Sequence, residues 1–257
     1  MPPEPDRRSV TSMSERDVAG WTRWSRQMAI PGFGAKAQKK LKHSRVVVLG
    51  VGGVGGAAAL YLAAAGVGSL VLVDRDEVEL TNLNRQVLFS TIDLGRPKAE
   101  AGAKRLRSLD PELEVEAVVL DAEEDDLVLL IEGADFVLNC FDENIDRLAA
   151  NRVCISLAVP ASYGFAQDFS GEVFTVLPQL SACLACALDE TFPEPEVTPV
   201  VGVATGIIGV AMAAAALRSL TGIGDVNAGQ RLIYDLAFSE LIRIPVPRNP
   251  RCPVCGR

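Results

Sequence analysis

Apolar and polar segments alternate in a regular order along the first half of the chain. Short apolar runs predict strands at 45–49, 69–73, 114–120 and 136–139. The intervening Ala-rich or amphipathic segments predict helices at 54–65, 98–108 and 145–158. Strands that alternate with helices are typical of a parallel sheet covered on both faces, which binds ligands at the carboxyl ends of its strands.

The second half has a different pattern. A strand at 172–176 is followed by a helix of small apolar residues at 202–220. Two further segments, 231–235 and 240–244, predict an antiparallel hairpin. Between the first strand and the helix, residues 189–199 are rich in proline and acidic residues, which predicts a surface loop.

We therefore expect an α/β protein with a Rossmann-like nucleotide-binding fold, in which antiparallel strands continue the parallel sheet. No internal repeat or low-complexity linker separates the halves, so the sequence predicts one domain over residues 1–257. Residues 1–20 are expected to be a loose tail, residues 21–160 the nucleotide-binding half, and residues 161–257 the second half.

Composition restricts the possible functions. With 257 residues, 49% of them hydrophobic, the chain can bury a full core. The net charge of -8 and the pI of about 4.9 argue against a nucleic-acid partner, which requires a basic face. One basic run, from Lys39 to Arg45, is interpreted as the solvated end of a helix.

Two features bear on location. The N-terminal residues lack an apolar stretch of signal-peptide length, so we expect a cytoplasmic protein. The uncharged run from Val200 to Leu217 is long enough to span a membrane. Because this run consists largely of alanine and glycine, we predict a buried helix and no membrane association.

Four of the six cysteines form two Cys-x-x-Cys pairs, Cys183 with Cys186 and Cys252 with Cys255. Two such pairs present four thiolates tetrahedrally, which predicts a structural Zn²⁺ that ties the C-terminus to a distant loop. The alternative is a pair of disulfides or unrelated thiols, which a cytoplasmic location disfavours. Cys140 and Cys154 lie among apolar neighbours and are expected to be small core residues.

A glycine-rich segment, VVVLGVGGVGG, follows the first predicted strand and begins a helix. The spacing Gly50-x-Gly52-x-x-Gly55 fits the dinucleotide fingerprint, and Asp74 closes the next strand where a ribose hydroxyl would need an acceptor. Taken alone, this pattern indicates an NAD(H)-dependent oxidoreductase.

Charged residues near the same predicted edge favour another chemistry. The segments DRDEVELTNLNRQ, GRPK and NCFDEN follow predicted strands or begin a helix. They are expected to bring five side chains towards the glycine loop: Asp74, Asn82, Arg85, Lys98 and Asp142. A site for a triphosphate needs several fixed cations, whereas hydride transfer needs few. Taken singly, Arg85 and Lys98 fit solvated loop charges and Asp142 fits a helix cap. Only the constellation as a whole favours a triphosphate.

The chain resembles the bacterial adenylyltransferases that activate ubiquitin-like sulfur carriers, the family of MoeB, ThiF and HesA, which is similar in turn to the ubiquitin-activating enzymes. The resemblance extends from WSRQ at residues 24–27 through the glycine loop, VDRDEVELTNLNRQ, GRPK and the strand end near Asp142 to both cysteine pairs. The glycine loop alone is a weak signal. The combination in this order is specific.

The resemblance implies a reaction in which the C-terminal Gly-Gly carboxylate of a carrier attacks the α-phosphate of ATP, giving an acyl-adenylate and pyrophosphate. It assigns Asp74 to the ribose, Asn82, Arg85 and Lys98 to the phosphates, and Asp142 to Mg²⁺. The complete nucleotide site it implies is Gly50, Gly52, Gly53, Gly55, Asp74, Asp76, Thr81, Asn82, Arg85, Gln86, Lys98 and Asp142. Residues 161–257 are then the carrier-binding half.

A further arginine, Arg26, corresponds to a residue that reaches the partner subunit's active site in the family. The resemblance therefore implies a homodimer with two shared sites and assigns Arg26 a catalytic role with Arg85, Lys98 and Asp142. The sequence itself shows only an arginine in a predicted N-terminal helix.

Two departures from the family pattern stand out. Where Thr-Asp-Asn is expected around the magnesium ligand, this chain has Phe141, Asp142 and Glu143. Some relatives form a covalent thiol intermediate on a cysteine at the place of Thr198, and no cysteine occurs between Cys186 and Cys252. We therefore expect this chain to adenylate only and a separate sulfur donor to attack the adenylate.

Alternatives remain at this level. The glycine spacing and Asp74 support the oxidoreductase but leave the cations and paired cysteines unexplained. A non-catalytic scaffold that holds the carrier is a second possibility, although Arg85, Lys98 and Asp142 argue against it. Adenylation of a peptide or a tRNA base is a third, with tRNA disfavoured by the acidic charge. The sequence does not identify the carrier or its pathway.

Overall fold

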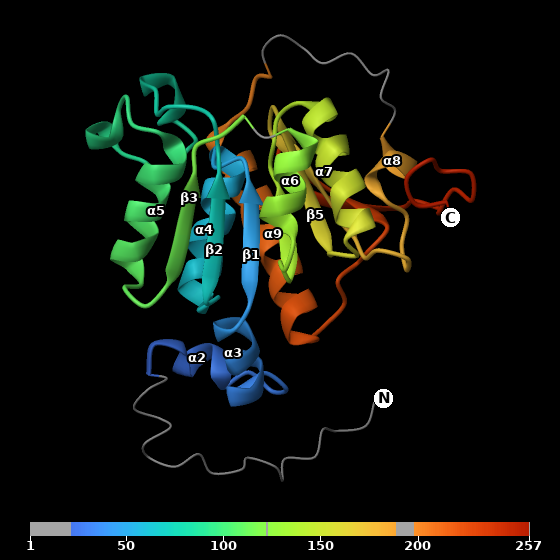
Figure 1. The fold of residues 1–257 in the computed structure, drawn as a ribbon, viewed down its shortest axis with the longest axis horizontal. Coiled ribbons are helices and arrows are strands. Elements are labelled where there is room, and N and C mark those ends of the chain that lie inside the picture. Colours follow the sequence, from blue (N-terminus) through green and yellow to red (C-terminus); the bar gives the residue numbers. More distant parts are fainter. Residues whose placement is uncertain (1–21, 122, 189–197, 257) are drawn as a thin grey trace.

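A single eight-stranded sheet runs through the computed structural model, which describes residues 22–121, 123–188 and 198–256 (Figure 1). The spatial order of the strands is β3-β2-β1-β4-β5-β6-β7-β8. Their bounds are β1 (Arg45–Leu49), β2 (Ser69–Val73), β3 (Glu114–Val118), β4 (Phe136–Asn139), β5 (Ala161–Gln167), β6 (Ser170–Val176), β7 (Gln230–Asp235) and β8 (Glu240–Pro245). The first five strands pair in parallel and β5 to β8 pair antiparallel, which confirms the predicted mixed sheet.

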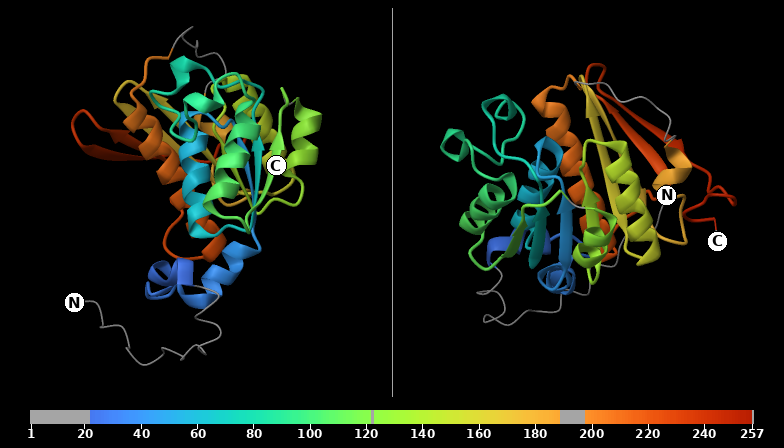
Figure 2. Two further views of the ribbon diagram at one scale, coloured as in Figure 1. Left: turned by 90° about the vertical axis from the view of Figure 1, so that its left-hand side faces the viewer. Right: turned by 45° about the horizontal axis from the view of Figure 1, so that its top comes forward.

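Helices cover both faces of the parallel part (Figures 1 and 2). The α-helices are α2 (Ser25–Met28), α3 (Gly34–Lys42), α4 (Gly53–Ala65), α5 (Lys98–Leu109), α6 (Glu124–Ile131), α7 (Asn144–Ser156), α8 (Leu184–Ala187) and α9 (Gly202–Thr221). Three short 3-10 helices are η1 (Thr22–Trp24), η2 (Leu80–Asn82) and η3 (Thr91–Asp93). One apolar cluster joins α4, α5 and α9 to the sheet, and a second joins α6, α7 and the cysteine region to the opposite face.

The central strand β1 is apolar at nearly every position because both of its faces are covered. Helix α4 is built largely from alanine and glycine because α9 lies directly against it. A Cβ atom at Gly209 of α9 would overlap the backbone oxygen of Val54 in α4. The small residues therefore allow the two helices to pack in close contact.

Helix α9 is the only helix in the described residues that is long and apolar enough to cross a membrane. Ile208, Met212 and Ala216 are fully buried against the sheet and α4. The prediction of a buried helix at this position is confirmed.

Several elements were absent from the sequence prediction: β5, α6, α8, most of α3 and the three 3-10 helices. The other predicted elements agree with the structure to within two residues; β3, for instance, ends at Val118 instead of Leu120. The basic run does lie at the C-terminal end of α3, where Lys40 donates to the backbone oxygen of Thr221 and Lys42 pairs with Glu112. The predicted tail at 1–20 and most of the predicted loop at 189–199 lie outside the described residues. The division into two functional halves stays a prediction.

Candidate active site

The glycine loop between β1 and α4 is a tight turn at the carboxyl end of the sheet. Gly50 has a φ of +82°, and a Cβ atom there would lie 2.7 Å from the backbone oxygen of Cys140. A Cβ atom at Gly55 would overlap the backbone oxygen of Gly50. Gly52 is the N-cap of α4 and adds no capping side chain. The loop therefore presents the positive end of the α4 dipole, a setting that suits a phosphate.

Asp74, directly after β2, forms hydrogen bonds that hold this loop in place. Its Oδ2 accepts a 2.7 Å hydrogen bond from the backbone N–H of Val51, and its Oδ1 accepts one of 2.9 Å from the N–H of Asp76. Burial raises the pKa of Asp74 above its ordinary value, and these two hydrogen bonds oppose that rise. Asp74 thus lies at the predicted place beside the loop, with both oxygens engaged by backbone donors.

Lys98, the first residue of α5, lies at the same edge. Its ammonium is 2.7 Å from Oδ2 of Asp76, and its backbone N–H donates to the backbone oxygen of Asp76 at 2.8 Å. The lysine is 6% exposed, so a nearly buried cation is fixed close to Asp74 and the glycine loop. Asp76, which was predicted for the nucleotide site, is thus the ion-pair partner of Lys98, and its contact with a nucleotide stays a prediction.

The segment 79–86 supplies the remaining polar groups. The side chain of Asn82 accepts from the N–H of Glu79 and caps η2, and Arg85 donates to the backbone oxygen of Thr81 at 3.0 Å. Gln86 is 4% exposed, and its Oε1 has no hydrogen-bond partner within the part of the chain that the structure describes. The Gln86 amide faces Gly52. An orphaned buried amide beside the glycine loop fits a site that completes its hydrogen bonds with a ligand.

Helix α9 closes this side of the loop. A Cβ atom at Gly53 would lie 2.8 Å from Oγ1 of Thr205, and one at Gly202 would lie 2.5 Å from the backbone oxygen of Asn84. Gly53 is therefore required for helix packing, a role that differs from the ligand contact predicted for it, which remains untested.

Asp142 and Glu143 are exposed at the connection from β4 to α7. Glu143, which replaces the asparagine expected from the family pattern, pairs with Arg75 at 2.9 Å. Asp142 keeps its predicted place at the carboxyl end of the sheet. Its assignment to Mg²⁺ stays a proposal.

Arg26 is not brought to this edge within one chain. It is exposed on α2, which lies beyond the amino ends of the strands, opposite the glycine loop (Figure 1). A role for Arg26 at the nucleotide site therefore requires a second subunit.

Sequence reasoning missed two arginines near the site. Arg75 stands between Asp74 and Asp76 in the quoted DRDEVEL segment, so its place in that motif was an available signal. Arg147, on the first turn of α7, has its guanidinium 4.2 Å from the centre of the Phe165 ring in β5. Only the strand order, which places β5 beside β4, brings these two residues together.

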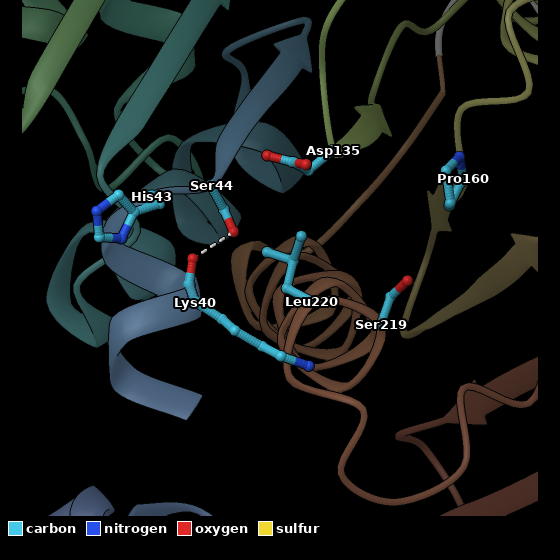
Figure 3. A pocket seen from close by; sticks show the side chains of 7 residues that line it. All are labelled: Lys40, His43, Ser44, Asp135, Pro160, Ser219 and Leu220. Atoms are coloured by element: carbon cyan, nitrogen blue, oxygen red, sulfur yellow. Dashed lines mark hydrogen bonds between the residues drawn. The ribbon is translucent and has the colours of Figure 1, made fainter. Parts of the chain in front are cut away.

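A separate hollow of about 440 Å³ lies at the amino end of the sheet (Figure 3). It is lined by Lys40, His43, Ser44, Asp135, Pro160, Ser219 and Leu220. The Lys40 ammonium donates to Thr221, the Ser44 hydroxyl donates to the backbone oxygen of Lys40, and Asp135 accepts from the backbone N–H of Arg45. These groups are engaged by the fold itself, and the hollow is remote from the glycine loop.

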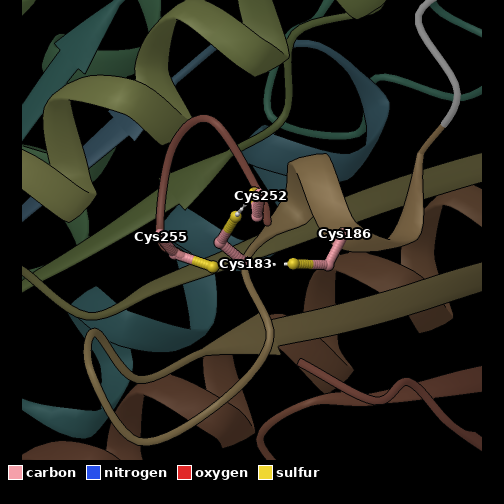
Figure 4. A group of neighbouring side chains, drawn as sticks. All are labelled: Cys183, Cys186, Cys252 and Cys255. Carbon is pink, nitrogen blue, oxygen red and sulfur yellow. Dashed lines mark hydrogen bonds between the residues drawn. The ribbon is translucent and has the colours of Figure 1, made fainter. Parts of the chain in front are cut away.

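The four paired cysteines form one compact cluster (Figure 4). Their sulfur atoms all lie within 4.8 Å of one another, with Cys183 to Cys252 at 3.7 Å and Cys186 to Cys255 at 3.5 Å. Tetrahedral thiolates at 2.3 Å from Zn²⁺ are about 3.8 Å apart, whereas a disulfide requires about 2.0 Å. Burial raises the pKa of the Cys183 and Cys186 thiols. Burial acts in the same direction at Cys252, but hydrogen bonds from the backbone N–H groups of Cys255 and Val254 lower the pKa of that thiol to about 7. The donor set fits a metal ion.

The two remaining cysteines pack in the core, as predicted. Cys154 is 1% exposed, and the half-buried Cys140 lies 3.9 Å from the sulfur of Met212. Burial raises the pKa of each thiol to about 12, so both are protonated at neutral pH.

Comparisons with known proteins agree with this geometry. Residues 24–254 match the ThiF family. The sulfur carrier protein adenylyltransferase of Thermus thermophilus is 38% identical over 245 residues, which are 91% of this chain and 90% of that protein. The sulfur carrier protein ThiS adenylyltransferase of Escherichia coli is 36% identical over 249 residues, 95% of this chain and 97% of that protein. A crystal structure of E. coli MccB with ATP has a TM-score of 0.78 and 23% identity, covering 95% of this chain and 82% of that chain.

Fold, site and relatives together define the class, an adenylyltransferase of the ubiquitin-activating type. The chain belongs to the ThiF family. The family resemblance and the enzyme class inferred from the sequence are confirmed. The relatives are adenylyltransferases, not the oxidoreductases that the glycine spacing alone would suggest.

Proposed function

We propose that the chain adenylates the C-terminal carboxylate of a ubiquitin-like sulfur-carrier protein that ends in Gly-Gly, with ATP as the second substrate and pyrophosphate as the leaving product. The observation that carries the proposal is the nearly buried Lys98 ammonium beside the glycine loop and Asp74. A fixed cation at this edge suits the charge that develops during attack on a phosphate. The names of the relatives give the substrate class.

The reaction needs the carboxylate aligned with the α-phosphate and the phosphate charge neutralised, and it needs no proton acceptor. A terminal carboxylate has a pKa of roughly 3.5 and is already ionised at neutral pH, so no general base is required. In this account Asp74 orients the ribose, Asn82, Arg85 and Lys98 bind the phosphates, and Gln86 completes its hydrogen bonds with the nucleotide. Asp142 would hold Mg²⁺, which neutralises phosphate oxygens when bound.

A face for the carrier is available on the antiparallel part of the sheet. Cross-strand register places Phe165, Glu172, Ile233 and Ile242 in one row on the same face. Ile242 and its neighbour Ile244 are 43% and 42% exposed, and the hairpin of β7 and β8 extends beyond the helices (Figure 2). The row runs from the hairpin to Phe165, which contacts Arg147 on the first turn of α7, and the extended tail is proposed to lie along it.

The cysteine cluster is proposed to hold a structural Zn²⁺. Cys183 and Cys186 flank the start of α8, and Cys252 and Cys255 lie near the C-terminus, so the metal would fasten the end of the chain to the second apolar cluster. The cluster is separate from the nucleotide site, which supports a stabilising role and no part in the chemistry.

The partner assignments extend this proposal. Exposed Arg26 at the far end of the sheet supports a homodimer in which each chain completes the other's site. A separate sulfur donor would attack the adenylate, and the reaction would take place in the cytoplasm.

Nucleotide identity tests the proposal against the oxidoreductase alternative. The thermal midpoint of the purified chain is measured with Mg-ATP and with the same concentration of NAD(H). A ligand at about 100 times its dissociation constant stabilises the native state by roughly 2.7 kcal/mol. We expect Mg-ATP alone to raise the midpoint, and a rise with NAD(H) alone would refute the proposal.

A further inference from the structure

The guanidinium of Arg75 connects three loops at the carboxyl edge of the sheet. Its Nη1 is 2.8 Å from Oδ1 of Asp121, which follows β3, and its Nη2 is 2.9 Å from Oε1 of Glu143, which follows β4. Its Nε is 3.9 Å from Oδ1 of Asp76, the neighbour that also binds Lys98. The fixed fork of an arginine suits several carboxylates in different directions, which a lysine does not.

The strand order places this contact at the edge of the sheet where the glycine loop begins. Strand β1 lies between β2 and β4, and the glycine loop begins at its carboxyl end. The contact between Arg75 and Glu143 therefore joins the loops that follow the two neighbours of β1. This point, where the chain connections leave the sheet in opposite directions, is where open α/β sheets bind their ligands.

Carboxylates gather at this edge of the sheet. Asp76, Asp121, Asp142, Glu143 and Asp146 occupy the three loops and the first turn of α7. Burial, followed by the charge of Glu143, raises the pKa of Asp146, and Arg75 opposes that rise. A polyphosphate that enters this region meets strong repulsion unless the carboxylates are neutralised from within.

We propose that Arg75 is a positioning residue of the nucleotide site, which neutralises Asp121 and Glu143 and holds Glu143 away from the metal position at Asp142. The inference rests on the proposed use of ATP. Without Arg75, the freed carboxylates repel the triphosphate and compete for the divalent cation. The loss is therefore one of nucleotide affinity, and it is reversed when the freed charge of Glu143 is removed.

The chain offers a closely matched control. Arg152 pairs with Glu124 at 2.8 Å, with side chains 42% and 49% exposed, against 44% and 49% for Arg75 and Glu143. This pair joins α7 to α6 outside the glycine loop and its flanking segments. Arg152→Ala therefore removes an equally exposed arginine and leaves the proposed site untouched.

The test measures the Kd of the non-hydrolysable analogue AMPCPP by calorimetry at fixed low Mg²⁺, with thermal midpoints recorded to establish folding. We expect Arg75→Ala to raise the Kd by about fivefold, the upper range for an exposed pair. Arg75→Lys should be intermediate, Arg152→Ala unchanged, and Arg75→Ala combined with Glu143→Gln should recover most of the lost affinity. High Mg²⁺ should narrow the difference between wild type and Arg75→Ala.

Two results overturn the inference: an unchanged or lower Kd for Arg75→Ala, or no recovery on adding Glu143→Gln to a folded Arg75→Ala chain. Absence of AMPCPP binding by the wild-type chain would overturn the proposed function itself, and with it this inference.

Discussion

The ammonium of Lys98 lies 2.7 Å from Oδ2 of Asp76, with the lysine side chain 8% exposed and that of the aspartate 55% exposed. A buried cation thus has a partner that remains accessible to solvent. If Lys98 binds a phosphate as proposed, the exposed partner would let the phosphate share the ammonium without a large rearrangement. This arrangement keeps the positive charge fixed at the glycine loop before a substrate binds.

Replacing Lys98 tests this role. Lys98→Ala should lower the rate of pyrophosphate exchange by a factor on the order of 10²–10³, because it removes one preorganised cation. The freed Asp76 is half exposed, so the chain should still fold. Lys40→Ala, at the remote end of the sheet, is the control and should keep its rate. Initial rates at saturating ATP measure the effect, and a loss of less than threefold would contradict it.

Two glycine-to-alanine substitutions compare a position where a Cβ atom cannot fit with a position where it can. Gly55→Ala should destabilise the fold by about 1–3 kcal/mol, since its Cβ would overlap the backbone oxygen of Gly50. Gly206→Ala in α9 meets nothing within 4 Å and should instead stabilise by roughly 0.5–1 kcal/mol. Thermal unfolding of both variants checks the pair. If both substitutions changed the stability by the same amount in the same direction, the close approach of Gly55 to Gly50 would be contradicted.

Metal removal should weaken the fold. We expect about one Zn²⁺ per chain by elemental analysis, and loss of that metal in Cys252→Ser. Loss of a structural zinc should cost at least about 2 kcal/mol, a fall in midpoint of roughly 4–8 °C. Cys154→Ala, also a buried cysteine but outside the cluster, should keep its metal. A chelator that strips the metal from folded protein without moving the midpoint would exclude a structural role.

Mixed subunits test the position of Arg26. Arg26→Ala and Lys98→Ala chains should each be inactive alone, and their heterodimers should regain part of the activity, because one of the two shared sites is then intact. Heterodimers are isolated with two affinity tags and assayed for pyrophosphate exchange. No recovery in verified heterodimers would contradict a site shared between subunits.

Much of the fold was predictable because local patterns agree with the tertiary structure. The buried strand at 45–49 and the glycine loop have strong local signals, and their places were right. Helix α6 was not predicted. Its short sequence, EDDLVLLI, consists of an acidic first turn followed by an apolar run, so it lacks the alternation of apolar and polar residues that marks an amphipathic helix. Strand β5, ASYGFAQ, includes a glycine and lacks the usual β-branched residues, and the partners β4 and β6 define it.

The sequence predicted which edge of the sheet several polar residues occupy, but not how they contact one another. Asp74 and Lys98 lie at the expected edge, but the pairing of Lys98 with Asp76 depends on the meeting of two loops 22 residues apart. The bridge from Arg75 to Glu143 spans 68 residues and crosses an intervening strand. Such contacts follow from strand order, which the sequence pattern alone does not determine.

Pyrophosphate exchange with a defined carrier tests adenylation most directly. The assay measures incorporation of labelled pyrophosphate into ATP in the presence of a ubiquitin-like carrier that ends in Gly-Gly, with the same carrier lacking its last glycine as the control. The account predicts exchange that depends on the intact tail and is lost in Lys98→Ala. Two results would contradict the account. One is exchange that is equally fast with the carrier that lacks its last glycine, and the other is no exchange with any of a panel of Gly-Gly carriers when the enzyme is folded and metal-loaded.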